Sequence, residues 1–96
     1  MSIKVTVTRI IDGDTFVVSP GWEWQTKHGD RIRPTKLCAP EIDEDEGEEA
    51  AEKLADLILD ESVELRNAVR IDRGRLVCDV YYDGQELVDY FPEYEC

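Results

Sequence analysis

The sequence predicts a mainly β protein, a small barrel of five strands with one helix between the third and fourth strands. Three observations predict this fold class. Alternating or β-branched apolar residues mark five short segments, only one segment has the spacing of a helix, and turn residues separate the segments. The 96 residues suit a single domain over residues 1–96. A chain of this length buries a modest core and has no room for a large internal cavity.

Three strands are expected before the helix. Residues 3–7 alternate apolar and polar side chains, as in a half-buried strand, and an Asp-Gly-Asp turn separates them from a β-branched segment at 15–18. Residues 19–30 should form a loop or an irregular hairpin. The third strand is expected over 31–37, where Pro34 restricts it to an edge or a bulge.

Residues 47–59 have the periodicity of an amphipathic helix. One face, at spacing i, i+3, i+4 and i+7, consists of Ala51, Leu54, Ala55 and Ile58. Acidic residues crowd the start of this helix, where its dipole favours negative charge. The fourth and fifth strands are expected at 63–65 and 76–82. This order of elements predicts an OB-fold, a small barrel that often binds oligonucleotides.

The charge of the chain is unevenly distributed. The net charge is −12, and residues 41–64 contain 12 acidic residues and one lysine. The remainder is therefore almost neutral, and the acidic segment would repel nucleic acid. A phosphate-bearing partner should approach from another side, or with a metal ion that offsets the charge.

The chain shows no export or membrane segment. The N-terminus lacks a basic region followed by an apolar run, and no stretch approaches the length that spans a bilayer. We therefore expect a cytoplasmic monomer without a membrane partner. The odd number of cysteines, Cys38, Cys78 and Cys96, argues against a disulfide framework and a zinc site, and predicts buried, reduced thiols. For Cys38 in particular, the absence of a nearby histidine favours a core residue over a ligand or nucleophile.

Three short motifs occur in a specific order along the chain. They are Ile11-Asp12-Gly13-Asp14-Thr15, the segment from Arg33 to Pro40-Glu41, and Asp72-Arg73-Gly74-Arg75. Each alone is ordinary turn or surface chemistry, but the ordered set resembles the staphylococcal nuclease (thermonuclease) family. The resemblance covers nearly the whole chain, including the helix opening and the ending of the fifth strand.

The resemblance implies a metal-assisted phosphodiesterase that hydrolyses DNA or RNA. The resemblance implies that Arg33 and Arg75 clamp the phosphate and stabilise its developing charge, as bidentate arginines do. Glu41 matches the general base. Asp14 resembles the carboxylate that holds a divalent metal, with Ca²⁺ the expected ion, and the carbonyl of Ala39 takes the place of a second metal contact. Asp12 lies where the family keeps another acid near the metal.

This chain departs from the family pattern in three places. Cys38 replaces the second calcium carboxylate, and a thiol is a poor partner for a hard cation. The loop before Arg75 lacks the family's tyrosine and is shorter. The chain ends at Cys96, which leaves Tyr90, Phe91 and Tyr94 as the available replacements for the family's nucleotide-contacting tyrosines.

Two other functions follow from the same features. A catalytically inactive module of this fold could bind nucleic acid or a protein partner through the acidic helix or the tryptophans Trp22 and Trp24, although one of these is as well explained by packing over the barrel end. An acidic protein that mimics nucleic acid and blocks a basic partner is a third reading, motivated by residues 41–64. The residues themselves identify no nucleic-acid-binding surface.

Overall fold

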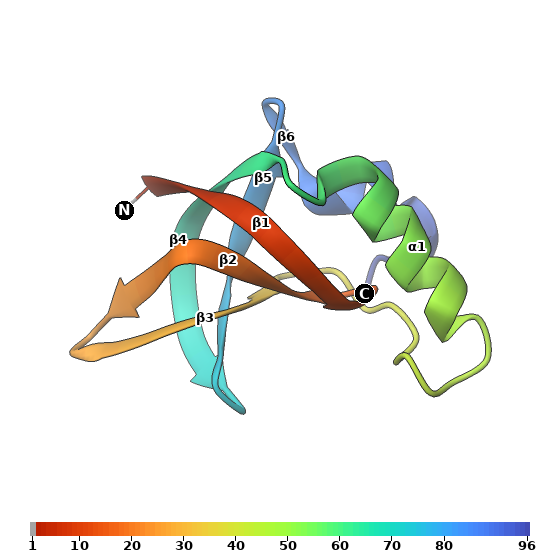
Figure 1. Ribbon diagram of the computed structural model, residues 1–96, viewed down its shortest axis with the longest axis horizontal. Coiled ribbons are helices and arrows are strands. Elements are labelled where there is room, and N and C mark those ends of the chain that lie inside the picture. The colour runs from red at the N-terminus through yellow and green to blue at the C-terminus, as the bar shows by residue number, and fades with distance from the viewer. Residues whose placement is uncertain (1) are drawn as a thin grey trace.

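The computed structural model describes residues 2–96 and shows an OB-fold-like β-barrel with one helix packed against it (Figure 1). The strands are β1 (Ser2–Asp12), β2 (Thr15–Trp24), β3 (Lys27–Pro34), β4 (Ser62–Asp72), β5 (Arg75–Tyr82) and the short β6 (Gln85–Glu86). Helix α1 (Gly47–Ile58) follows β3, and two 3-10 helices, η1 (Leu87–Tyr90) and η2 (Pro92–Tyr94), follow β6. The predicted fold class and the place of the helix are confirmed.

The five long strands close into a barrel. Their hydrogen-bonded order is β3-β2-β1-β4-β5, and β3 also pairs with β5. The closing pair is parallel, whereas the other neighbours are antiparallel. In the parallel pair Arg31 lies opposite Arg75 and Arg33 lies opposite Val77. Closure of the barrel therefore brings Arg33 and Arg75, which are far apart in the sequence, onto adjacent strands.

The core fills the barrel and extends beneath α1. Its largest fully buried side chains include Phe16, Ile32, Leu54, Leu65 and Leu76, which come from four strands and the helix. Dense packing of this kind is the main stabilising contribution in a small domain. Among the described residues, no helix has the length and apolar character needed to cross a membrane.

The boundaries of four strands differ from the sequence prediction, and the first of them, β1, continues to Asp12 instead of ending at residue 7. Residues 19–30 form an irregular hairpin, one of the two predicted alternatives: β2 and β3 both extend into it, with a shifted register between Val17 and Trp22. The third strand ends at Pro34, not at residue 37, since proline has no backbone N–H for a ladder. The fourth strand continues to Asp72, far beyond 63–65. A bulge between Arg66 and Arg70 interrupts the alternation of apolar and polar residues in this strand. The sequence pattern therefore did not indicate its second half.

Helix α1 turns a slightly different face to the core than its spacing predicts. Leu54 and Ile58 are fully buried as expected, and Ala50 is buried beside them. Ala51 and Ala55 are only half-buried. Alanine is compatible with either position, so the apolar spacing alone does not determine the rotation of the helix. Trp22 is buried, and its Nε1–H donates to the carbonyl of Arg31 at 2.9 Å, so of the two alternatives considered for the tryptophans this residue takes the packing role.

Candidate active site

The site begins at the tight turn between β1 and β2. The backbone N–H of Asp14 donates to Oδ1 of Asp12 at 3.1 Å. A Cβ on Gly13 would lie 2.6 Å from the Cβ of Ala39 and 2.7 Å from that of Ala50. Only glycine allows the turn, the segment after β3 and the start of α1 to pack this closely. This packing determines how far Asp12 and Asp14 lie from the segment that carries Glu41.

A compact turn before α1 holds Glu41. Oε1 of Glu44 accepts the backbone N–H of Glu41 at 3.0 Å, and the N–H of Glu44 donates to the carbonyl of Glu41 at 2.9 Å. A Cβ on Gly47 would overlap that same carbonyl oxygen. Glycine at the first position of the helix therefore permits the loop to fold back on α1. The Glu41 side chain itself is exposed to solvent.

Arg33 approaches Asp14 from the end of β3. Its Nη2 lies 3.6 Å from Oδ2 of Asp14 and 4.0 Å from Sγ of Cys38. The Arg33 side chain is 23% exposed to solvent, and the Asp14 side chain is 10% exposed. A guanidinium has five N–H donors, so these two long contacts leave most of them available to a ligand.

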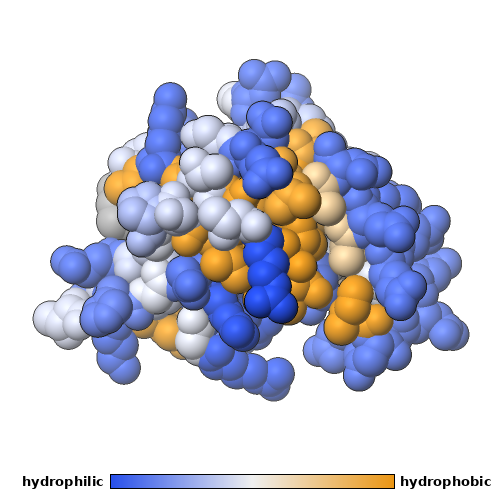
Figure 2. All heavy atoms as spheres, in the orientation of Figure 1, coloured by the Kyte–Doolittle hydropathy of each residue, from blue (hydrophilic) through white to orange (hydrophobic). Residues whose placement is uncertain are grey.

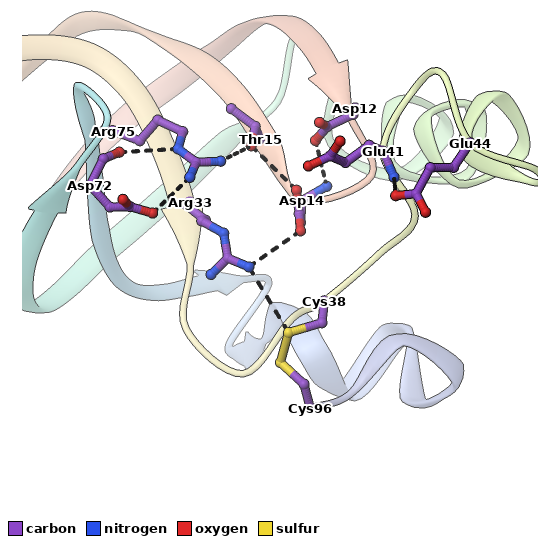
Figure 3. Close-up of polar contacts among 10 residues, drawn as sticks. All are labelled: Asp12, Asp14, Thr15, Arg33, Cys38, Glu41, Glu44, Asp72, Arg75 and Cys96. Carbon is purple, nitrogen blue, oxygen red and sulfur yellow. Dashed lines mark hydrogen bonds and ion pairs between the residues drawn. A yellow bond between two sulfur atoms is a disulfide. The ribbon is translucent and has the colours of Figure 1, made fainter.

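Arg75 is held more tightly than Arg33. Its Nη2 donates to Oδ2 of Asp72 at 2.8 Å, and its Nε donates to the carbonyl of the same residue at 3.2 Å. Its Nη1 donates to the hydroxyl of Thr15 at 3.2 Å, and that hydroxyl donates to Oδ1 of Asp14 at 3.3 Å. A hydrogen-bonded path thus joins Arg75 to Asp14 (Figure 3). The absence of the family's tyrosine has not displaced Arg75 from the site.

All six residues predicted for the site line one cleft of about 390 Å³. Its lining consists of Asp12, Asp14, Arg33, Cys38, Ala39, Glu41, Glu44, Arg70, Asp72, Arg73 and Arg75. The volume falls in the range of small-ligand sites. Four arginines and five carboxylates make the lining more negative than positive by one charge. An anion would therefore enter more favourably together with a cation.

Asp14 is the buried acid of the cleft. Burial, together with hydrogen bonding and repulsion from Asp12, raises the pKa of Asp14 to about 6, although Arg33 opposes the shift. Beside Asp12, the negative charge of Asp14 is thus only partly compensated by protein groups such as Arg33. A carboxylate in this environment is a favourable partner for a bound cation, because the cation replaces the lost hydration.

The cysteines contradict the sequence prediction. Cys38 and Cys96 form a disulfide with a Cα–Cα distance of 5.6 Å. Cys38 is also exposed rather than part of the core. An odd number of cysteines excludes a fully paired set but not one disulfide, and these two are brought together by the return of the chain end. Two backbone hydrogen bonds hold the chain end in this place. The N–H of Cys38 donates to the carbonyl of Tyr94 at 2.7 Å, and the N–H of Cys96 donates to the carbonyl of Lys36 at 3.0 Å. Only Cys78 is the buried free thiol that was expected.

The donors around Asp14 fit a divalent cation that is held by few protein ligands. The carboxylates of Asp12, Asp14 and Glu41 line the same cleft as Ala39, and hard cations prefer such oxygens. Within residues 2–96, however, no three acidic, histidine or cysteine side chains converge on one point. The sulfur of Cys38 is bonded to another sulfur and contributes no thiolate. Water and phosphate oxygens would have to complete the shell of an ion at Asp14.

The C-terminal aromatic residues do not line the cleft. Phe91 is buried in the core, and the hydroxyl of Tyr90 donates to the carbonyl of Tyr82 at 2.9 Å. Tyr94 packs against Phe91, and Nζ of Lys53 from α1 lies 5.4 Å from the Tyr94 ring centroid. These three residues close the barrel beside α1, so the idea that they replace nucleotide-contacting tyrosines is not supported by their placement.

Sequence reasoning missed several residues of the cleft. Asp72 and Thr15 position Arg75, while Arg70 and Arg73 add exposed positive charge to the rim. Asp72 and Thr15 lie inside the motifs that were recognised, so their side chains could have been assigned to the site. Arg70 follows the bulge of β4, where no local pattern indicates which face it occupies.

Comparison with known proteins finds no family model and no curated protein that matches this chain.

Proposed function

We propose that this protein is a metal-assisted phosphodiesterase that cleaves DNA or RNA, similar to the staphylococcal nucleases. One observation carries the proposal: Asp14, Arg33, Glu41 and Arg75, from four separate segments, line a single cleft. Two arginines opposite two carboxylates suit the hydrolysis of a phosphate diester, in which charge accumulates on phosphoryl oxygens while water attacks. Random placement of four such residues on a small barrel would rarely unite them.

The two arginines would bind the non-bridging oxygens of the phosphate. Arg75 is oriented in advance by Asp72 and Thr15 and keeps two N–H donors beyond those contacts. Arg33 has only long contacts and can turn toward a ligand. Bidentate hydrogen bonds from both would strengthen as charge builds on the phosphate in the transition state.

Glu41 would act as the general base. Its exposed carboxylate is reachable by water at the cleft, and the Glu44 contact holds its backbone in place. The carboxylate takes a proton from the attacking water as the new P–O bond forms. The bond from phosphorus to the leaving sugar oxygen then breaks, and that oxygen is protonated from solvent.

A divalent cation bound by Asp14, with Asp12 and the carbonyl of Ala39 nearby, would supply further positive charge to the phosphate. The chain's own contribution is to hold Asp14 buried at the wall of the cleft, where protein groups compensate its negative charge only in part. The excess of one negative charge in the lining supports this part of the proposal.

Cleavage of a fluorophore–quencher oligonucleotide, in DNA and RNA versions, tests the proposal. The wild type should cut with Ca²⁺, Mg²⁺ or Mn²⁺ and lose activity with a chelator. Glu41→Gln and Arg75→Ala should each reduce the rate by about 100-fold or more, as losses of a base or of a charge-stabilising donor do. Matched variants outside the cleft, Glu49→Gln and Arg9→Ala, should cut normally. Equal activity in all four variants would show that the cleavage is due to a contaminant.

The disulfide favours a second candidate, a binding module that has lost catalysis. Cys38 occupies the position of a metal carboxylate in the resembled family and is unavailable as a ligand. The double variant Cys38→Asp/Cys96→Ser restores a carboxylate, and Cys38→Ser/Cys96→Ser is its control for the lost disulfide. Metal-dependent cleavage in the first variant alone, with none in the wild type, would show that the natural site has lost catalysis and would refute the active enzyme.

A further inference from the structure

The positive and negative charges that line the cleft lie on opposite sides of it. The arginines come from β3, β4, β5 and the β4–β5 hairpin, and they are Arg33, Arg70, Arg73 and Arg75. Every lining carboxylate except Asp72 comes instead from the end of β1, the turn after it, or the segment between β3 and α1. Figure 3 shows the labelled members of the two sets on different sides of the site. One side therefore carries four arginines and one carboxylate, and the other carries four carboxylates and no basic residue.

Closure of the barrel extends the positive side onto the outer surface of three strands. Arg70 of β4 and Arg33 of β3 are both register partners of Val77 and lie on either side of it. Two residues earlier in β3 and β5, Arg31 lies opposite Arg75. Side chains alternate along a strand, and the residues between these positions are buried, so the four arginines project from the outer face. The spacing of strands places Arg70 and Arg33 roughly 10 Å apart.

Most of the arginines on this surface have no acidic partner. We call the surface formed by Arg31, Arg33, Arg70, Arg73 and Arg75 the arginine surface. Arg33 and Arg75 each pair with an aspartate. Arg31, Arg70 and Arg73 are exposed, and within residues 2–96 none of them forms an ion pair. Their guanidinium donors are therefore available to an anion from outside the protein.

The carboxylates that border the arginine surface offset only part of its charge. Asp72 is engaged by its ion pair. Asp79 lies further along β5 and accepts two side-chain hydrogen bonds. Asp30, in β3, is directed by alternation to the other face of that strand. Five arginines against these three acids leave a positive surface on a protein whose net charge is −12.

The composition of the arginine surface favours a chain of phosphates as its ligand. All of its basic residues are arginines, whose planar guanidinium pairs with phosphate oxygens in bidentate fashion. A single phosphate in the cleft would not engage Arg31, which lies outside the cleft lining. A stacked nucleic-acid strand carries a phosphate about every 3.4 Å along its axis, so a surface roughly 10 Å wide meets about three of them.

The acidic part of the chain determines the direction in which such a strand can leave the cleft. Residues 41–64 hold 12 acidic residues and one lysine, and they begin on the negative side of the cleft. A strand that ran toward α1 would be repelled, whereas one that ran over β5 and β3 would move away from this charge. In Figure 2 hydrophilic side chains cover the end of the molecule where Figure 1 shows the β4–β5 hairpin, and apolar side chains gather where β1 meets α1.

We propose that the arginine surface binds the phosphates of a nucleic-acid strand that flank the phosphate held in the cleft. Arg31 and Arg70 would contact the neighbouring phosphates, while Arg33 and Arg75 hold the central one. The substrate would then be a strand of several nucleotides that enters over β3 and β5. The inference rests on the proposed function for the place of the central phosphate, but binding by Arg31 and Arg70 does not require cleavage.

Fluorescence anisotropy with a dye-labelled single strand of about 12 nucleotides, in DNA and RNA versions, tests the proposal. The Glu41→Gln background with Ca²⁺ keeps the strand intact. In this background Arg31→Ala/Arg70→Ala should weaken binding at least about tenfold and should reduce the slope of log affinity against log salt by about 1.4, or 0.7 for each lost phosphate contact. The charge-matched control Lys4→Ala/Arg9→Ala, on β1, should weaken binding by less than about threefold.

The possible outcomes separate this inference from the proposed function. No binding of the oligonucleotide at low salt, unchanged affinity in the Arg31→Ala/Arg70→Ala variant, or an equal loss in the control would each overturn the inference. Equal affinity for a polyglutamate peptide of the same charge would also overturn it, in favour of an acidic protein partner. A wild type that binds the strand through Arg31 and Arg70 but never cuts it would uphold the inference and refute the proposed enzyme.

Discussion

Asp72 holds Arg75 through two separate acceptors, its carboxylate at 2.8 Å from Nη2 and its backbone carbonyl at 3.2 Å from Nε. The two residues flank the turn Arg73-Gly74 and face each other as register partners of β4 and β5. Arg73 and Gly74 both have positive φ, 54° and 79°, as a two-residue hairpin turn requires. The orientation of a candidate phosphate-binding arginine is thus determined by the geometry of one hairpin.

The first prediction concerns this pair. Asp72→Asn keeps the turn and the carbonyl acceptor but removes the charge that fixes the guanidinium. We expect the cleavage rate constant to fall about tenfold, equivalent to about 1.4 kcal/mol of lost transition-state stabilisation. Steady-state kinetics on the oligonucleotide substrate measures it, with Asp83→Asn in the next hairpin as the control. A tenfold loss in both variants would indicate general damage instead.

The second prediction concerns Arg33. Because a lysine cannot form the bidentate fork of a guanidinium, Arg33→Lys should recover little of the activity that Arg33→Ala loses. We expect both variants to lie within about tenfold of each other and well below the wild type. Cleavage rates of the wild type, Arg33→Lys and Arg33→Ala, measured at low and moderate salt, distinguish bidentate binding from simple charge attraction. Full activity in Arg33→Lys would show that Arg33 contributes only positive charge.

The third prediction concerns pH and Asp14. The pKa of this buried acid is raised from 3.8 to about 6, so the folded protein takes up a proton that the unfolded chain binds only at lower pH. The free energy of unfolding should therefore rise as the pH falls from about 6 to about 4, and this contribution is lost as the pH rises through 6. Two pKa units correspond to at most about 3 kcal/mol, shared with the neighbouring Asp12.

Urea unfolding between pH 4 and pH 8 measures the effect. The variant Asp14→Asn should be more stable than the wild type at pH 8 and should lose this part of the pH dependence. Asp45→Asn, at an exposed position, is the control. Parallel pH profiles for wild type and Asp14→Asn would contradict the assignment. Such a cost in stability is common for residues retained for function.

The fourth prediction concerns the disulfide. Cys38 and Cys96 are 58 residues apart, and closing a loop of that length stabilises the fold by about 4 kcal/mol in the chain-entropy model. Reduction, or the variant Cys38→Ser/Cys96→Ser, should lower the free energy of unfolding by a similar amount. Urea unfolding with and without a dithiol measures it, and the reductant should leave the double variant unchanged.

Thiol titration gives an independent check on the same pairing. Burial raises the pKa of Cys78 to about 12, which keeps it protonated and unreactive in the folded protein. The native protein should therefore show no rapidly reacting thiol, and reduction should expose two. Rapid reaction of Cys38 without reductant would refute the disulfide.

The fifth prediction concerns Gly47. In most helices a change from glycine to alanine stabilises the protein by up to about 1 kcal/mol. Here a Cβ would overlap the carbonyl oxygen of Glu41, so Gly47→Ala should destabilise the fold by about 2 kcal/mol or more and displace Glu41. Thermal unfolding shows directly whether the substitution stabilises or destabilises the fold, and Glu48→Ala, one residue further in the helix, is the control. A stabilised Gly47→Ala would mean that the loop does not fold back on α1.

Local patterns in the sequence determined the elements and their order. Alternation identified β1 and β5, and helical spacing identified α1 within one residue of its observed end. These signals are local because strand and helix each repeat within a few residues. The ordered motifs also predicted that Asp14, Arg33, Glu41 and Arg75 would meet, and the shared cleft agrees with that placement. Their roles in catalysis stay predictions.

Only the tertiary structure decided which distant groups became partners. The pairing of Cys38 with Cys96 depends on how the chain end returns to the loop after β3, and no spacing in the sequence encodes that distance. The second half of β4 and the arginine surface likewise depend on barrel closure, which sets the register of β3, β4 and β5. The physical reason is that hydrophobic burial is non-directional: it specifies that Leu54 and Ile58 go inside, but the packing of the whole barrel sets which neighbours they and the polar groups around them meet.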